Sequence, residues 1–221
     1  YVCVVNYLGD KVLHKNIDTE AEEFLKLIEP YRGKIAVGVE CMFRWYWLAD
    51  VCNYQKIPFV LGHCLYMKAL SGGKVQNDRI DSERIALLLK SGMFPECYVY
   101  PKEMRATRDL MRRRSFFVRK RAELIAHIQM TYQQYNVKKD NSKNLTYTKN
   151  RLALSDSFEE KSVQHIVDSE CRLIQQYQDE ILALENHIKK ATAKNSKNAL
   201  NLSLLQTIPG IGDVLGLTLL Y

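Results

Sequence analysis

Residues 74–90 read KVQNDRIDSERIALLLK, and this stretch decides how the first half of the chain folds. Asn77 or Asp78 can cap a helix here, because a short polar side chain accepts hydrogen bonds from the first unpaired N–H groups. Asp78 and Asp81 are three residues apart, so both carboxylates leave one face of the first turn. They either complement the helix dipole or bind a cation together. The positions that would face a core are Ile80, Ile85, Leu88 and Leu89.

An apolar run at residues 34–40, KIAVGVE, is typical of a buried strand and places Glu40 at its carboxyl end. In open α/β sheets, ligand sites form at this end of the strands. Glu40 is therefore either solvated at the sheet rim or part of one site with Asp78 and Asp81. Three carboxylates are a hard-oxygen set suited to Mg²⁺ or Mn²⁺. We expect Glu40, Asp78 and Asp81 to be the metal ligands and catalytic residues.

The composition excludes several classes of protein. The chain has 221 residues and is 47% hydrophobic, which allows a buried core and an extension. Its six cysteines include no C-x-x-C pair, which argues against structural zinc and a disulfide framework. No apolar run approaches the roughly 20 residues of a membrane span, and no signal peptide opens the chain. We expect a cytoplasmic protein that does not associate with membranes.

Positive charge is concentrated in one segment. The net charge is +7, and residues 101–121 carry nine basic residues against two acidic ones, so this segment accounts for all of it. The segment is either a solvated helix face or a surface for nucleic acid. Arginine outnumbers lysine there, and its planar fork suits phosphate. The residues expected to contact RNA or DNA are Arg105, Arg108, Arg112, Arg113, Arg114, Arg119, Lys120 and Arg121.

Three motifs follow one another along nearly the whole chain. They are Val37-Gly-Val-Glu40 with the aromatic run FRWYW at 43–47, then Lys74-x-x-Asn-Asp78-x-x-Asp81-Ser-x-x-Ile-Ala86, then Gln206-Thr-Ile-Pro-Gly-Ile-Gly212. In order and spacing, the chain resembles the DEDD-type transposases of the insertion-sequence "one-ten" family. The resemblance implies an RuvC-like domain of RNase H fold, a coiled coil and a C-terminal transposase domain, guided by a structured RNA. It also implies a bacterial or archaeal source.

The first hundred residues predict an α/β domain. In order they indicate a hairpin (1–7 and 11–17), a helix carrying residues 24–28, a strand (35–39), a helix (43–55), a strand (57–61) and helices at 63–70 and 78–90. This is the order of an RNase H-like fold that lacks its first strand, on which the resembled family carries its first aspartate. Asp10 falls in the hairpin turn and is not a match. We therefore expect a chain truncated at its N-terminus.

The remainder predicts helices. Apolar residues at helical spacing indicate a long basic helix beyond Pro101, an exposed polar loop at 136–156, and a second long helix with about four heptads between Val163 and Ala191. We expect an antiparallel coiled coil, with packing inside one globular domain as the alternative. The turn Ile208-Pro-Gly-Ile-Gly212 is either a plain helix connection or a helix-hairpin-helix element, in which Gly210 and Gly212 expose N–H groups to phosphate.

The expected domains are an RuvC-like domain (1–101), a basic coiled-coil region (102–195) and the beginning of the C-terminal transposase domain (196–221). The resemblance implies a Mg²⁺-dependent DNA recombinase that exchanges strands through a serine–DNA intermediate and works as a homodimer or larger homo-oligomer. No serine here matches the family's catalytic serine, so we expect this chain to bind nucleic acid without recombining it. The alternatives are an RuvC-like Holliday-junction endonuclease and a non-enzymatic coiled-coil RNA-binding protein.

Overall fold

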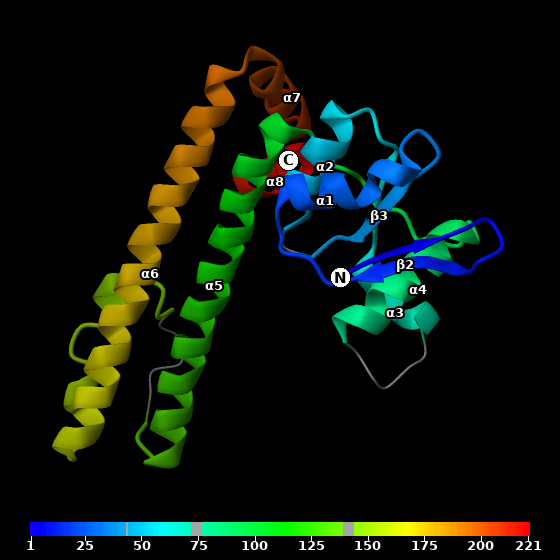
Figure 1. Cartoon of the computed structure of the whole chain (residues 1–221). Helices are drawn as coiled ribbons and strands as arrows, with labels where there is room; N and C mark the ends of the chain where they lie inside the picture. The colour runs from blue at the N-terminus through cyan, green and yellow to red at the C-terminus, as the bar shows by residue number, and fades with distance from the viewer. Residues whose placement is uncertain (43, 72–76, 139–143) are drawn as a thin grey trace. The chain divides into compact units, whose positions relative to one another are not determined.

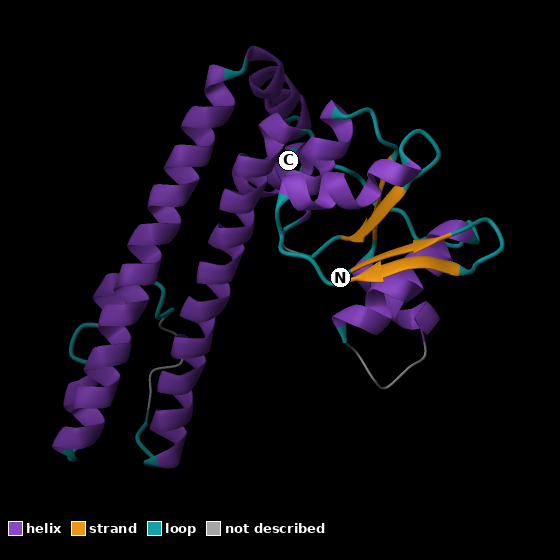
Figure 2. Ribbon diagram, in the orientation of Figure 1, coloured by secondary structure: helices purple, strands orange, loops and turns teal. Residues whose placement is uncertain are grey.

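The structure is a computed structural model that describes residues 1–42, 44–71, 77–138 and 144–221 (Figure 1). The chain divides into two compact units, Tyr1–Lys102 and Glu103–Tyr221. All the strands that the structure describes lie in the first unit, and the second unit is built from helices (Figure 2). Among the described residues, no helix combines the length and the apolar character needed to cross a membrane.

Four short strands form two sheets in the first unit. One sheet is an antiparallel hairpin and the other is a parallel pair in which Glu40 lies opposite Gly62. The predicted hairpin and the predicted strand ending at Glu40 are both confirmed. The strands are β1 (Val2–Val5), β2 (Lys11–Lys15), β3 (Val37–Glu40) and β4 (Phe59–Gly62).

The helices of this unit follow the predicted order. They are α1 (Ala21–Ile28) with the short 3₁₀ turn Glu29–Tyr31, α2 (Trp45–Tyr54), α3 (Cys64–Ser71) and α4 (Asp78–Lys90). The α/β class is therefore confirmed, while the assignment to the RuvC-like fold stays a prediction. Of the motif residues, Phe43 and residues 74–76 lie outside the described part of the chain.

Helix α4 begins where the sequence predicts. Asn77 is the N-cap, and its side-chain oxygen accepts a hydrogen bond of 2.8 Å from the N–H of Ile80. The helix packs against β1 and β3. Close packing of this kind needs glycine on β3, because a Cβ built at Gly38 would lie only 3.0 Å from the Leu89 side chain. The cap begins the helix at Asp78, and the contact of Gly38 with Leu89 brings the last turn of α4 against β3.

Two long helices, α5 (Lys102–Gln134) and α6 (Lys161–Lys194), dominate the second unit (Figure 1). Their contacts run from Arg114–Glu185 through Phe117–Tyr177 to His127–Glu170, so residue numbers rise along α5 as they fall along α6. This order shows an antiparallel pair. Whether the seam has coiled-coil geometry stays a prediction. The α6 residues that are buried are Val163, Val167, Glu170, Ile174, Ile181, Ile188 and Thr192.

The connection between the two long helices differs from the exposed loop that the sequence predicts. Residues 139–143 lie outside the described part, but from residue 144 onward the segment packs onto the helices. Leu145 is 2% exposed and Arg151 is 6% exposed. The Arg151 guanidinium donates hydrogen bonds of 2.7 and 2.9 Å to the carbonyls of Leu145 and Thr146. The expectation of exposure is wrong for Leu145 and Arg151, because these backbone hydrogen bonds let the guanidinium be buried, whereas Tyr147 and Leu152 are exposed as predicted.

Two short helices complete the second unit, α7 (Ser196–Gln206) and α8 (Asp213–Leu220). Leu217 and Tyr221 join a buried cluster with Met111 of α5 and Ile188 of α6. The Tyr221 hydroxyl also lies 3.2 Å from the buried hydroxyl of Thr192. The segment after residue 196 is therefore packed against the long helices in the same compact unit.

Candidate functional site

The charge of Asp81 on α4 acts on the carboxylate of Glu40 at the carboxyl end of β3. Burial raises the pKa of Glu40, and the negative charge of Asp81 raises this pKa further, while Lys68 of α3 partly offsets both. The Asp81 carboxylate is also 3.4 Å from Arg84, one turn further along α4. Two half-buried acids of like charge are costly to keep ionised side by side. Glu40 and Asp81 therefore influence one another electrostatically, and their role as metal ligands stays a prediction.

The third predicted ligand, Asp78, lies apart from this arrangement. It is the first residue of α4, and its side chain is exposed. Within the described residues, no group of three or more His, Cys, Asp or Glu side chains is arranged to hold a metal ion. The expected cluster of three carboxylates is therefore not formed in this structure. Positions three apart on a helix share a face only approximately, and Asp81 is the one on the β3 side.

Residues of the hairpin hold α4 in place, and no sequence pattern pointed to them. The imidazole of His14 on β2 lies 3.1 Å from the Arg79 carbonyl and 3.1 Å from the Ser82 hydroxyl. Lys11 forms an ion pair of 2.9 Å with Glu83. These contacts come from the side of α4 that carries Ser82 and Glu83. They fix the helix to the hairpin and so position Asp81.

Two thiols lie beside the carboxylates. The sulfur atoms of Cys41 and Cys64 are 3.5 Å apart, because Cys41 follows β3 and Cys64 opens the helix after the neighbouring strand β4. The pKa of the Cys64 thiol is raised by burial first, then by the contact with Cys41, with a further contribution from the charge of Glu40. A raised pKa keeps the thiol protonated and unreactive at neutral pH. We assign this pair to packing.

The basic residues of α5 divide between the helix interface and the surface. Arg105 is 7% exposed, which makes its guanidinium the least accessible of the predicted phosphate contacts. Arg114 pairs with Glu185 of α6 at 2.8 Å, and Arg121 donates to Gln178 of α6. Burial and the nearby charge of Arg114 lower the pKa of Arg121. These two arginines therefore stabilise the helix pair.

Other basic residues of α5 remain on the surface. Arg112, Arg113 and Arg119 are exposed, and Lys120 is half-buried. Lys120 pairs with Glu123 at 2.7 Å, and Arg108 and Arg112 also have interaction partners. Exposed arginines on one helix suit the backbone of a nucleic acid, which carries regularly spaced phosphates. Of the predicted contacts to nucleic acid, Arg112, Arg113 and Arg119 are therefore the most accessible.

The turn before α8 is less suited to phosphate than the sequence predicts. Gly210 has a positive φ of 90°, and a Cβ built at Gly210 or Gly212 would meet nothing within 4 Å, so the turn is open. Asp213 nevertheless places a carboxylate at the first position of α8, where it pairs with Lys189 at 2.5 Å. A phosphate bound at this helix start would face that negative charge.

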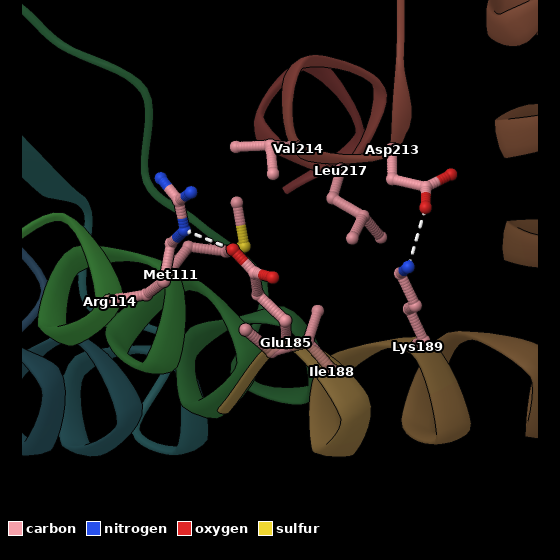
Figure 3. A pocket seen from close by; sticks show the side chains of 8 residues that line it. All are labelled: Met111, Arg114, Glu185, Ile188, Lys189, Asp213, Val214 and Leu217. Atoms are coloured by element: carbon pink, nitrogen blue, oxygen red, sulfur yellow. Dashed lines mark hydrogen bonds and ion pairs between the residues drawn. The ribbon is translucent and has the colours of Figure 1, made fainter. Parts of the chain in front are cut away.

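A small pocket of about 80 Å³ lies beside this turn in the helical unit (Figure 3). Figure 3 shows the Arg114–Glu185 pair at one side and the Lys189–Asp213 pair at the other. Met111, Ile188 and Leu217 provide its apolar lining. The charged side chains that line the pocket are paired with one another in these two ion pairs. We therefore interpret the pocket as a packing gap between α8 and the long helices and not as a site for a charged ligand.

Comparison with known proteins agrees with the motifs. A family model described as a transposase, of the DEDD type represented by IS110, matches residues 1–137. The match covers more than half of the 221 residues and includes Glu40, Asp81 and all of α5. A search of curated proteins returned no significant match. The chain therefore belongs to the IS110-type DEDD transposase family.

Proposed function

We propose that this chain supplies the metal-binding carboxylates and a nucleic-acid-binding surface to a Mg²⁺-dependent recombinase that acts in DNA transposition with a structured guide RNA. The observation that supports the proposal is that Glu40, at the carboxyl end of β3, is half-buried and subject to the like charge of Asp81, which raises its pKa. A divalent cation relieves the repulsion between two such carboxylates, and removal of the cation restores it. Assembly as a homodimer or larger homo-oligomer is part of the same proposal and follows from the family resemblance.

The residues present fit Mg²⁺ without requiring a third protein ligand. Mg²⁺ usually takes one or two carboxylates and completes its coordination with water and substrate phosphate oxygens. Glu40 and Asp81 would hold the ion, and Mn²⁺ accepts the same oxygen donors. When bound, such an ion polarises a phosphoryl oxygen and activates the attacking oxygen. Asp78, on the first turn of α4, stays a proposed additional ligand.

The exposed basic residues of α5 supply the second part of the function. Each phosphate neutralised by Arg112, Arg113 or Arg119 releases a counterion, which gives affinity that does not depend on sequence. The choice of DNA target then falls to base pairing with the guide RNA, as in other RNA-guided systems. The protein needs only to hold the nucleic-acid backbones and to present its carboxylates.

Thermal unfolding with and without Mg²⁺ tests the metal site. A ligand at 100 times its dissociation constant stabilises a folded protein by about 2.7 kcal/mol. We expect Mg²⁺ to raise the melting temperature of the wild type but not of Glu40→Gln or Asp81→Asn. Glu83→Gln is the matched control, since Glu83 lies on the same helix but pairs with Lys11, and it should keep the Mg²⁺ effect. Asp78→Asn shows whether Asp78 contributes. If Mg²⁺ stabilised all variants equally, Glu40 and Asp81 would not be the metal ligands.

Salt dependence of binding tests the basic helix. The triple variant Arg112→Gln, Arg113→Gln, Arg119→Gln should reduce the slope of log affinity against log salt by roughly 2 to 3, about 0.7 to 0.9 per phosphate. Arg172→Gln, an exposed position on α6, is the control and should leave the slope nearly unchanged. An unchanged slope in the triple variant would exclude α5 from the interface. Cleavage of branched DNA without any RNA would instead favour the endonuclease alternative.

A further inference from the structure

We infer that Phe116 and the cations around it form a stacking platform for an unpaired base, so that α5 binds single-stranded or looped nucleic acid in preference to a duplex. The inference deepens the proposed nucleic-acid function and rests on it. It starts from two adjacent phenylalanines, Phe116 and Phe117, which face different surroundings on the same helix turn.

Phe117 packs between the two long helices. Its ring centroid lies 5.6 Å from that of Tyr177 on α6, which accounts for an aromatic residue at this position. Phe116 is half-buried like Phe117, and its ring centroid lies 5.9 Å from that of Phe117, but Phe116 also has two cations beside its ring. The guanidinium carbon of Arg113 lies 5.4 Å from its ring centroid, and the amine of Lys120 lies 5.8 Å from it. Phe116 therefore borders the basic residues of α5, whereas Phe117 contacts Tyr177 of the facing helix.

The spacing places these side chains on one face of α5. Arg113, Phe116 and Lys120 stand at positions i, i+3 and i+7, which lie one above another on a helix. Arg112 and Arg119 are each one residue away from this row and are exposed. One surface thus offers an aromatic ring with positive charge above, below and beside it.

This combination matches an unpaired nucleotide better than a duplex. Single-strand-binding surfaces pair a basic track for the backbone with aromatic rings on which bases stack. In a duplex, the bases are stacked on one another, and the backbone offers nothing for a phenyl ring to contact. RNA loops and ends present splayed bases that stack on aromatic rings or on arginine planes. A phenyl ring among arginines can therefore stack on the face of an unpaired base, whereas the bases of a duplex have no free face to offer it.

Lys120 is the cation that a base can displace from the ring. Its amine already forms an ion pair of 2.7 Å with Glu123, the next residue on that side of the helix turn. Leaving the ring therefore does not leave the ammonium without a partner. Arg113 would stay against the other part of the ring and provide a cation–π contact. Phe116 can then accept a base while α5 keeps its fold.

Fluorescence of 2-aminopurine tests the platform. The base analogue is placed in a single-stranded oligonucleotide and in the same sequence as a duplex, and both are titrated with the full chain. We expect quenching with the single strand alone, and roughly 5- to 100-fold weaker single-strand binding for Phe116→Leu with duplex binding unchanged. Phe116→Trp should keep or strengthen single-strand binding. Melting temperatures identify any variant that is merely unfolded.

Matched variants separate the possible failures. Phe117→Leu should lower the melting temperature but keep the preference for single strands. If Phe116→Leu binds single strands as the wild type does while the triple arginine variant binds weakly, the stacking platform is wrong and the basic interface stands. If the triple arginine variant also binds both forms normally, the proposed nucleic-acid function of α5 fails with it. Equal binding of single strand and duplex by the wild type would overturn the inference directly.

Discussion

The two units place buried charge in opposite environments. In the helical unit, the guanidinium of Arg151 is buried and donates to two carbonyls, and it also reaches the side chains of Thr148 and Gln175. In the α/β unit, the carboxylate of Glu40 is half-buried and faces the like charge of Asp81. The first charge has acceptors that match its donors, and the second is opposed by its neighbour.

The difference separates structural charge from functional charge. A buried group with all of its partners stabilises one conformation, as Arg151 does for the segment after residue 144. Two like-charged carboxylates that nearby cations offset only in part, as Lys68 does for Glu40, cost stability unless a ligand supplies more positive charge. Two ion pairs of the second unit, Arg114–Glu185 and Lys189–Asp213, follow the structural pattern. The buried Glu170 pairs with His127 through one oxygen, and its other oxygen has no hydrogen-bond partner among the described residues. The like charge of Asp81 acting on Glu40 is the reason for placing the candidate site in the α/β unit.

The largest expected effect tests whether the helical unit depends on its apolar seam. Ile174 is fully buried in a cluster with Ile128, Tyr132 and Val167. Ile174→Ala leaves a cavity there and should lower the free energy of unfolding by about 2–5 kcal/mol. Chemical denaturation followed by circular dichroism measures the change.

A neighbouring residue provides the control for this substitution. Leu173 precedes Ile174 on α6 and is 43% exposed, so Leu173→Ala should change the free energy of unfolding by about 0.5 kcal/mol or less. Equal losses from both variants would mean that the seam is not where the structure places it. The helical unit would then be held together by some other contact.

The next effect tests the charge that we assign to structure. Arg151→Met keeps the bulk of the side chain but leaves the carbonyls of Leu145 and Thr146 buried without their donor. We expect a loss of about 1–3 kcal/mol in the free energy of unfolding. Lys149→Met, an exposed position two residues earlier, should be nearly neutral. If Arg151→Met is equally neutral, the guanidinium is not the group that holds this segment.

Removing the charge of Glu40, which we assign to function, should increase the free energy of unfolding and not decrease it. Glu40→Gln removes one of two repelling carboxylates, so in the absence of divalent cations it should raise the free energy of unfolding by roughly 0.5–2 kcal/mol. Mg²⁺ should reduce or reverse this difference in the free energy of unfolding, because only the wild type keeps both carboxylate ligands. Denaturation with a chelator and then with Mg²⁺ measures both quantities. A destabilised Glu40→Gln protein in chelator would contradict the contrast between the units.

Local patterns were enough to predict the skeleton of both units. Alternating and continuous apolar runs predicted the hairpin and the strand ending at Glu40, and Asn77 is the cap that its short polar side chain predicts. Along α6, the predicted seam positions Val163, Ile174 and Ile188 are all buried. These features depend on residues close together in sequence, for which helix and strand periodicity is sufficient.

Features that depend on a distant partner were harder to predict. The sequence does not show that Asp81, rather than Asp78, approaches Glu40, because that depends on how α4 is rotated against β3. Nor does a count of basic residues show that Arg105 is buried. Helical spacing does place Arg114 and Arg121 seven residues apart on one face, and this signal could have separated them from the surface arginines.

The smallest effect concerns an exposed ion pair and depends on pH. A hydrogen bond from Lys189, and then its positive charge, lower the pKa of Asp213 below its ordinary value of 3.8. A lowered pKa means that the folded state favours the ionised form, so the pair stabilises the protein above about pH 3.8 and the contribution is lost as pH falls through the folded pKa. Asp213→Asn should therefore be less stable than the wild type at pH 7, by roughly 0.2–1 kcal/mol because the pair is solvated and screened. This difference in stability between the two proteins should disappear in acid and decrease in high salt.

The same contact raises the pKa of Lys189, so the difference in stability should also decrease as the solution becomes strongly alkaline. Unfolding curves of both proteins across this pH range measure it, and a gap that persists at pH 2 would show that Asp213 acts through packing at the start of α8 and not through its charge.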